Sequence, residues 1–202
     1  MIADCIAMFK WIGDFRLRLV GLVLVVVGYF GPWIPHKAVA LTVTGFELAE
    51  FTKSMPVTNE LFLTPLVAAA ILLGLSVHGA AGRLPVRLIG TAFAALLALG
   101  ALPPYEYIRD PQYRPQLILA VGGLLLVLLT PLTRRLSRRA QGILVAILAL
   151  AGAVLALWQF ILLRPLVVTL YNAPIGLGWG LIVCAVGFVL ILLSSAVPQR
   201  EI

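Results

Sequence analysis

Arg134-Arg135-Leu136-Ser137-Arg138-Arg139 places four guanidinium groups within six residues, between two long apolar segments. Arginine does not lose its charge in proteins and is costly at the centre of a bilayer, so this stretch must lie in water. Short loops that are rich in Lys and Arg remain on the cytoplasmic side of a membrane. The stretch therefore predicts a cytoplasmic loop, from which the rest of the topology can be counted outward.

The composition indicates an integral membrane protein. Of the 202 residues, 62% are hydrophobic and 11% are charged, whereas about a quarter of the residues are charged in ordinary soluble domains. A helix needs about 20 apolar residues to span the hydrocarbon, so six spans would take up roughly 120 residues. We therefore expect an all-α polytopic membrane protein, with a single integral membrane domain over residues 1–202 and short loops.

The hydropathy pattern predicts six transmembrane helices. Before them, the apolar residues of segment 1–16 recur on one side of a helix, which favours an N-terminal interfacial helix. Trp33 is interpreted as an anchor at the membrane interface, and the fifth span is expected to end at Arg164-Pro165 because proline interrupts a helix. The six predicted spans cover residues 17–34, 61–77, 87–102, 117–132, 142–163 and 175–197.

Residues 35–60 are predicted to form a small extracytoplasmic cap. Thr44-Gly45-Phe46-Glu47 has the form of a capping box, which predicts a short amphipathic helix over residues 45–55. Its apolar face would carry Leu48, Phe51 and Met55. Segments 38–44 and 166–172 are β-prone and both external, so we expect them to lie close together as a small two-stranded sheet, with that helix packed over the bundle.

The distribution of Lys and Arg predicts the orientation. Ten of the 15 fall on the side of the four-arginine loop, and such an excess marks the cytoplasmic side. We therefore expect a multi-pass protein of the cell membrane with both termini in the cytoplasm. The ten are Lys10, Arg16, Arg18, Arg83, Arg87, Arg134, Arg135, Arg138, Arg139 and Arg200; the other five are Lys37, Lys53, Arg109, Arg114 and Arg164.

Small residues form two seams along the last two spans. Such seams mark places where helix backbones approach closely in lipid, because little hydrophobic force draws helices together there. The seam of the sixth span is a candidate packing or partner surface, open to an internal neighbour or to a foreign helix. The seams contain Gly142, Ala146, Ala149, Ala153 and Ala156 in the fifth span, and Gly176, Gly180, Cys184 and Gly187 in the sixth.

The loop between the third and fourth spans is the second candidate surface. It is rich in aromatic residues and arginine, which dominate the energetics of protein interfaces, although an aromatic belt at the membrane interface would have the same composition. Its candidate residues are Tyr105, Tyr107, Arg109, Tyr113 and Arg114.

Glu47 and Glu50 form a candidate extracytoplasmic polar face. With His36 they could meet as a metal or acid/base site, but glutamates also suit the first turns of a helix, where the dipole favours negative charge. The chain has no nucleophile motif, phosphate loop or metal-binding repeat. We therefore predict no catalytic residue, metal or cofactor, and no nucleic-acid binding, because the basic residues lie at helix ends.

These features lead to three hypotheses. The first is a non-catalytic multi-pass membrane subunit that packs against, positions or assembles a partner membrane protein, or a second copy of itself. The second is a small transporter, channel or lipid-handling protein without ion-coupling residues, which would need a water-filled or lipid-filled cavity at mid-depth. The third is a membrane enzyme, which would need His36, Glu47 and Glu50 to converge.

The predicted topology can be tested by cysteine accessibility. We expect a cysteine introduced by Ser137→Cys to react only with reagents that reach the cytoplasm, because Ser137 lies in the four-arginine loop. A cysteine introduced by Thr58→Cys should react with impermeant reagents added outside. Labelling of position 137 from outside, or of position 58 only from inside, would reverse the orientation.

Overall fold

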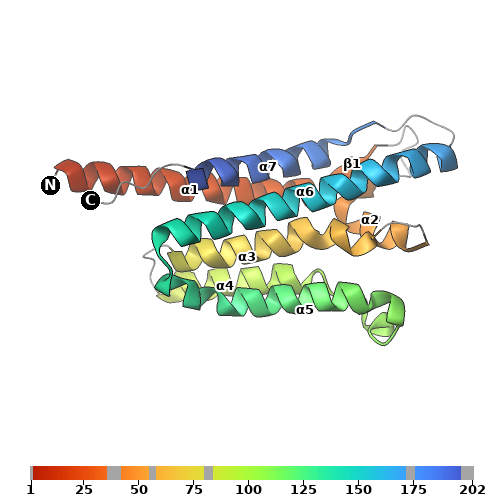
Figure 1. Ribbon diagram of the computed structural model, residues 1–202, viewed down its shortest axis with the longest axis horizontal. Helices are drawn as coiled ribbons and strands as arrows, with labels where there is room; N and C mark the ends of the chain where they lie inside the picture. The colour runs from red at the N-terminus through yellow and green to blue at the C-terminus, as the bar shows by residue number, and fades with distance from the viewer. Residues whose placement is uncertain (1, 36–41, 55–57, 80–83, 172–175, 197–202) are drawn as a thin grey trace.

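The structure is a computed structural model that describes residues 2–35, 42–54, 58–79, 84–171 and 176–196, and it is mostly helical (Figure 1). Seven α-helices and two strands occur in these ranges. The helices are α1 (Ile2–Phe30), α2 (Gly45–Phe51), α3 (Thr64–Gly79), α4 (Leu84–Leu99), α5 (Arg114–Leu129), α6 (Arg138–Tyr171) and α7 (Trp179–Ala196). Shorter 3-10 turns are η1 (Thr52–Ser54), η2 (Asn59–Leu63), η3 (Tyr105–Tyr107), η4 (Pro111–Tyr113) and η5 (Thr130–Arg135).

Helix α3 lies at the centre of the bundle. It contacts α1, α4, α5 and α6, and nearly all of its residues from Thr64 to His78 are buried. The physical reason is its sequence, which is apolar around the whole circumference, because a helix of this kind has no polar face to turn outward. The other helices are arranged around it with their axes roughly along the bundle (Figure 1).

The bundle has two distinct ends. The start of α1, the end of α7, η5 and the start of α6 lie at one end, which we call the arginine end (Figure 1). Strand β1 (Pro32–Ile34), α2 and the start of α7 lie at the other, which we call the cap end. The chain thus runs between the two ends along α1, α3, α4, α5, α6 and α7.

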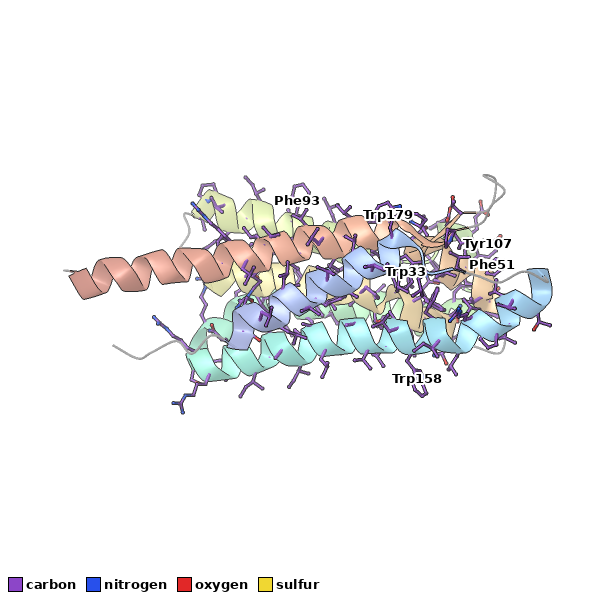
Figure 2. All side chains as sticks on the ribbon, turned by 90° about the horizontal axis from the view of Figure 1, so that it is seen from above. Trp33, Phe51, Phe93, Tyr107, Trp158 and Trp179 are labelled. Carbon is purple, nitrogen blue, oxygen red and sulfur yellow. The ribbon has the colours of Figure 1, made fainter. Side chains whose placement is uncertain are left out.

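The surface of the bundle is apolar in a way that indicates membrane association. Three helical segments are long and apolar enough to cross a membrane, namely Asn59–Gly79, Pro111–Arg135 and Arg138–Thr169. Leu84–Leu99 and Trp179–Ser195 are apolar but shorter, so the number of six spans remains a prediction. Side chains such as Leu88, Phe93 and Ile118 are more than half exposed, and Figure 2 shows Phe93 and Trp158 pointing away from the bundle.

Helices α1 and α7 are joined by direct backbone contact. A Cβ added at Gly28 would lie 2.6 Å from the carbonyl oxygen of Gly180, and one added at Gly180 would lie 2.7 Å from that of Gly28. A second pair of glycines repeats this contact about two helical turns away. A Cβ added at Gly21 would lie 2.8 Å from the carbonyl oxygen of Gly187, and one added at Gly187 would lie 2.6 Å from that of Gly21. Side chains larger than hydrogen would separate the two helices at these points.

The sheet is present, but one of its strands differs from the prediction. Strand β1 pairs antiparallel with β2 (Val43–Thr44), with Pro32 opposite Thr44 and Ile34 opposite Val43. Residues 36–41 lie outside the described residues. The prediction of a strand at 166–172 is wrong, because α6 continues through Pro165 to Tyr171. Leu163 and Val167 are buried in the core, and this packing outweighs the weak β-propensity of the segment.

The predicted boundary at residue 16 is also wrong. Residues 2–30 form the single helix α1 rather than an interfacial helix followed by a span. The segment around residue 16 contains no proline, so nothing in the backbone forces a break. The helix instead ends at Phe30, four residues before the predicted end, because Gly31 and Pro32 follow and Pro32 begins β1.

Trp33 is a core residue and not the interfacial anchor that the sequence predicted. Its side chain is 1% exposed, and its indole N–H donates to the carbonyl oxygen of Gly28 at 3.0 Å. The rings of Tyr29, Phe62 and Phe160 meet it edge-on, with centroids 6.2, 6.5 and 6.2 Å away. Trp33 therefore closes the interior of the bundle near the cap end.

The capping box that predicted α2 is confirmed. The Glu47 N–H donates to Thr44 Oγ1 at 3.2 Å, and the Thr44 N–H donates to Glu47 Oε2 at 2.8 Å. Leu48 is fully buried and Phe51 is partly buried against the core, so the apolar face of the helix points into the bundle. The α-helix ends at Phe51 and continues as η1, and Met55 lies outside the described residues.

The contact between α1 and α7 predicts that Gly28→Ala destabilises the protein. Because the new Cβ would lie well inside van der Waals distance of α7, we expect the free energy of unfolding to fall by about 1–3 kcal/mol or more. Thermal unfolding in detergent, followed by helical circular dichroism, measures this loss.

The matched control is Gly122→Ala in α5, where an added Cβ would meet nothing within 4 Å. This change should be neutral or stabilising by up to about 1 kcal/mol, the helix propensity of Ala over Gly. Equal thermal stability of the two variants would contradict the proposed backbone contact.

Candidate functional site

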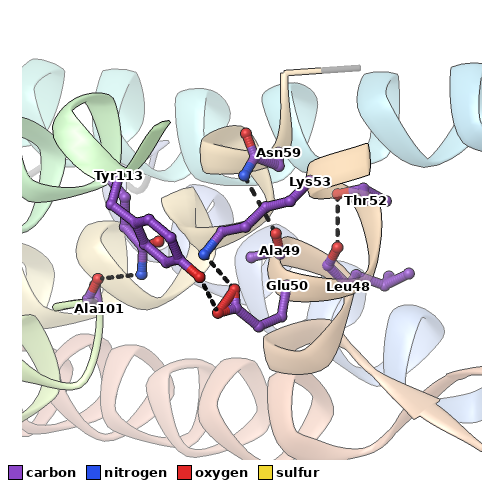
Figure 3. Close-up of polar contacts among 9 residues, drawn as sticks. Leu48, Ala49, Glu50, Thr52, Lys53, Asn59, Ala101 and Tyr113 are labelled. Carbon is purple, nitrogen blue, oxygen red and sulfur yellow. Dashed lines mark hydrogen bonds and ion pairs between the residues drawn. The ribbon is translucent and has the colours of Figure 1, made fainter. Parts of the chain in front are cut away.

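The cap end carries a cluster of polar and aromatic side chains drawn from two distant parts of the chain. The Tyr113 hydroxyl donates to Glu50 Oε1 at 3.1 Å (Figure 3). Glu50 also forms an ion pair with Lys53, whose Nζ lies 2.9 Å from the centroid of the Tyr113 ring. With Tyr107, whose ring stacks on Tyr113 at 5.0 Å and 6°, these residues form what we call the cap cluster.

Local capping positions the two halves of this cluster. On the side of α5, Asp110 caps η4 by accepting the Gln112 N–H at 2.9 Å, and Gln116 Nε2 donates to the carbonyl oxygen of Ala101 at 3.1 Å. On the side of α2, Asn59 Nδ2 donates to the carbonyl oxygen of Ala49 at 3.3 Å (Figure 3). These bonds fix each side separately, and the loop between α4 and α5 is held against α2 by the contacts of Tyr113 with Glu50 and Lys53.

The cap cluster fixes the orientation of the loop between α4 and α5 more through the burial of Tyr113 than through the strength of its ion pair. The side chains of Lys53 and Glu50 are 14% and 48% exposed, and because water reaches the Glu50 carboxylate, the ion pair contributes about 1 kcal/mol or less. The Tyr113 ring supplies the burial, since it is only 7% exposed and covers the Lys53 ammonium by a cation–π contact. The result is a fixed orientation of η3 and η4 over the end of the bundle.

Four predicted residues of this loop remain on the surface. Tyr105 is 89% exposed and Tyr107 is 43% exposed, and the side chains of Arg109 and Arg114 are exposed as well. We call these four residues the cap surface. Tyr113, the fifth predicted residue, turns inward and ties the cap surface to α2.

The predicted polar face does not form a metal or acid/base site in the described residues. Glu47 is occupied by the capping box and Glu50 by Tyr113 and Lys53. Within the described ranges no three His, Cys, Asp or Glu side chains lie close enough together to hold a metal ion. His36, the third residue of this hypothesis, lies outside those ranges.

The small-residue seam of α7 faces the inside of the protein. Gly180, Cys184 and Gly187 lie against α1, so these positions are occupied by an internal neighbour. Gly176 precedes α7 and is exposed. In α6, Ala149 and Ala156 of the other seam are buried. The seams therefore account for the internal packing of the bundle and leave little of themselves for another helix.

The interior near the cap end is nearly filled. Around Trp33 and Cys184 the free space is about 10 Å³, which is room for about one water molecule. Gly152 of α6 belongs to the same region, where a Cβ would meet Phe188 at 2.7 Å. This packing leaves no passage for a solute through that region.

Sequence reasoning missed the roles of Lys53 and Trp33. The spacing of Glu50 and Lys53, three residues apart on a helical turn, is a signal that could have revealed the ion pair. No local pattern could have paired Tyr113 with Glu50, which are 63 residues apart. Comparisons of the chain with protein-family models, with curated proteins and with solved structures find no match, so the geometry alone bears on function.

The cap cluster predicts an energetic coupling between Glu50 and Tyr113. Tyr113→Phe removes the hydroxyl that donates to Glu50, so we expect a loss of about 1 kcal/mol in the free energy of unfolding. Glu50→Gln should cost a similar amount, and the double variant should cost less than the sum of the two.

Thermal unfolding of the four proteins in detergent measures the coupling. Tyr105→Phe serves as the control, because Tyr105 is almost fully exposed and its hydroxyl should contribute nothing. Additive effects of Tyr113→Phe and Glu50→Gln would mean that the two side chains do not interact.

Proposed function

We propose that the protein is a non-catalytic, six-span subunit of the cell membrane that positions or assembles a partner membrane protein through its cap surface. In this proposal both termini are cytoplasmic and the cap end is extracytoplasmic. The partner contributes the part of its own chain that projects from the membrane next to the cap. The activity of the assembly belongs to the partner.

The observation that carries this proposal is the preorganised cap surface. A loop that carries an almost fully exposed tyrosine would ordinarily lose conformational entropy on binding, but the cap cluster holds this loop in place beforehand. Tyr105, Tyr107 and Arg109 are of the residue types that contribute most to binding at protein interfaces. Their exposure in a structurally fixed loop is typical of a recognition surface.

The course of the chain supports six spans. The chain passes between the arginine end and the cap end six times, along α1, α3, α4, α5, α6 and α7 (Figure 1). Helices α4 and α7 have 16 and 18 residues, or about 24 and 27 Å, somewhat less than the hydrocarbon thickness of about 30 Å. Modest thinning of the bilayer or anchoring by flanking residues accommodates such a difference.

A water-filled channel or an ion-coupled transporter has less support. Membrane transport paths use buried ionisable groups, whereas the one ionisable residue of α3 is His78, in its last turn at the arginine end. Its Nδ1 lies 3.0 Å from the carbonyl oxygen of Gly74 in the same helix. The nearly filled interior around Trp33 argues in the same direction.

Site-specific photocrosslinking in native membranes tests the proposal. We expect a photoreactive amino acid at position 105 to yield one dominant crosslinked protein, identified by mass spectrometry after mild solubilisation. The same amino acid at Ile147, an exposed apolar position in the first third of α6, should crosslink only to lipid. Arg109→Ala should reduce the yield at position 105 about tenfold, as expected for a residue that contributes about 1.4 kcal/mol to binding.

Two outcomes would overturn the proposal. The first is the absence of any protein crosslink at position 105, and the second is an equal yield of the same crosslink at position 147. A crosslink between two copies of this chain would identify the partner as a second copy, so that the assembly is a homo-oligomer.

A further inference from the structure

A long apolar groove runs between α6 and α7 on the outside of the bundle. Its volume is about 570 Å³, within the range of about 300–1,000 Å³ that is typical of small-molecule sites. Its walls are almost entirely hydrocarbon, and the one charged side chain in them is that of Arg164. The walls include Phe160 and Ile161 of α6, and Leu181, Val186 and Val189 of α7.

The groove has the depth of one leaflet. On α7 it extends from Leu181 to Leu190, which is about 14 Å at a rise of about 1.5 Å per residue. Half of the hydrocarbon thickness is about 15 Å. Because α7 runs from the cap end towards the arginine end, the groove begins near the cap end and reaches about the middle of the bilayer.

Arg164 lies at the level where lipid headgroups are expected. It follows Arg138, the first residue of α6, by 26 residues, or about 39 Å along the helix, so it lies beyond a hydrocarbon layer of about 30 Å. Its side chain is exposed, and within the described residues it forms no ion pair with a carboxylate. Trp158, which is 59% exposed one to two turns earlier and points away from the bundle (Figure 2), is typical of the adjoining interface.

The two faces of α7 indicate which kind of molecule occupies the groove. Towards α1, the helix presents Gly180, Cys184 and Gly187, the small residues that allow close packing of helices in lipid. Towards the groove, it presents mainly large branched side chains such as Val186 and Val189. A second helix cannot approach these side chains as closely as it can approach small residues, whereas a flexible hydrocarbon chain can fill the space between them.

We propose that this groove binds an anionic phospholipid of the cap-end leaflet, with one acyl chain between α6 and α7 and its phosphate on Arg164. The planar guanidinium group can donate two parallel hydrogen bonds to the phosphate oxygens. The acyl chain covers the apolar walls of both helices. This site is separate from the cap surface and does not depend on the partner proposed above.

Native mass spectrometry of the purified protein tests the site. The protein is exchanged into micelles that contain equal amounts of phosphatidylglycerol and phosphatidylcholine, and the retained lipid is measured as the collision energy rises. We expect one phosphatidylglycerol to be retained preferentially by the wild-type protein. Arg164→Gln should reduce the preference for the anionic lipid about tenfold, because the charge-assisted hydrogen bonds to the phosphate are lost.

Filling the groove provides a second, independent variant. Val186→Trp places a large ring in the groove at a position that is 46% exposed, so the fold should tolerate it, and retention of both lipids should fall. The matched controls are Val121→Trp, at a 43% exposed position of α5, and Arg139→Gln, at the arginine end; neither should change the retention. Circular dichroism verifies that each variant keeps its helical content.

Three results would overturn the proposal. One is retention of phosphatidylglycerol by the Arg164→Gln and Val186→Trp variants at the wild-type level. Another is an equal effect of Val121→Trp and Val186→Trp, which would indicate non-specific association with the apolar surface. The third is a copurifying protein that Val186→Trp displaces, which would mean that the groove holds a partner helix.

Discussion

The direct contact between the backbones of α1 and α7 is the constraint on which the rest of the structure depends. It joins the first and last helices of the chain through glycines that face each other, so that no side chain separates them. Arg18 Nε donates to Ser194 Oγ at 3.3 Å near the arginine end of the same pair. With α1 and α7 joined in this way, α3 is enclosed, and Trp33, just beyond α1, is carried into the core.

The burial of Trp33 also determines how the cap end is arranged. Leu48 and Phe62 anchor α2 and η2 in the core next to Trp33, which places Glu50 and Lys53 where the loop between α4 and α5 can reach them. The loop then closes by way of Tyr113, whose ring covers the Lys53 ammonium. This arrangement leaves polar groups near water and apolar groups inside, while it holds a set of aromatic and arginine side chains in a defined orientation.

The outside of the bundle has two kinds of surface. Over α4 and α5 the exposed side chains form a continuous apolar surface, as expected next to lipid tails. Between α6 and α7 the surface is hollowed, and a single cation stands at the headgroup end of the hollow. The cap surface and the groove are thus two chemically distinct surfaces, for which we propose a protein partner and an anionic lipid, respectively.

The sequence by itself determined the features that depend on local patterns. The apolar segments are helices, the capping box begins α2 at the expected residue, and the face of α2 that carries Leu48 is buried. Periodicity and propensity encode these features because they involve residues that are neighbours along the chain. The same patterns misplaced a strand at 166–172 and a break at residue 16, since β-propensity is weak and the surroundings of a helix decide where it ends.

Only the tertiary structure decided which surfaces meet. It brought the seam of α7 against α1, turned Trp33 into the core, and joined Tyr113 to Glu50 across 63 residues. It also left the groove between α6 and α7, which no periodicity predicts. The physical reason is that a small-residue seam or a tyrosine can be satisfied by many neighbours, and the choice among them is made by the packing of the whole bundle.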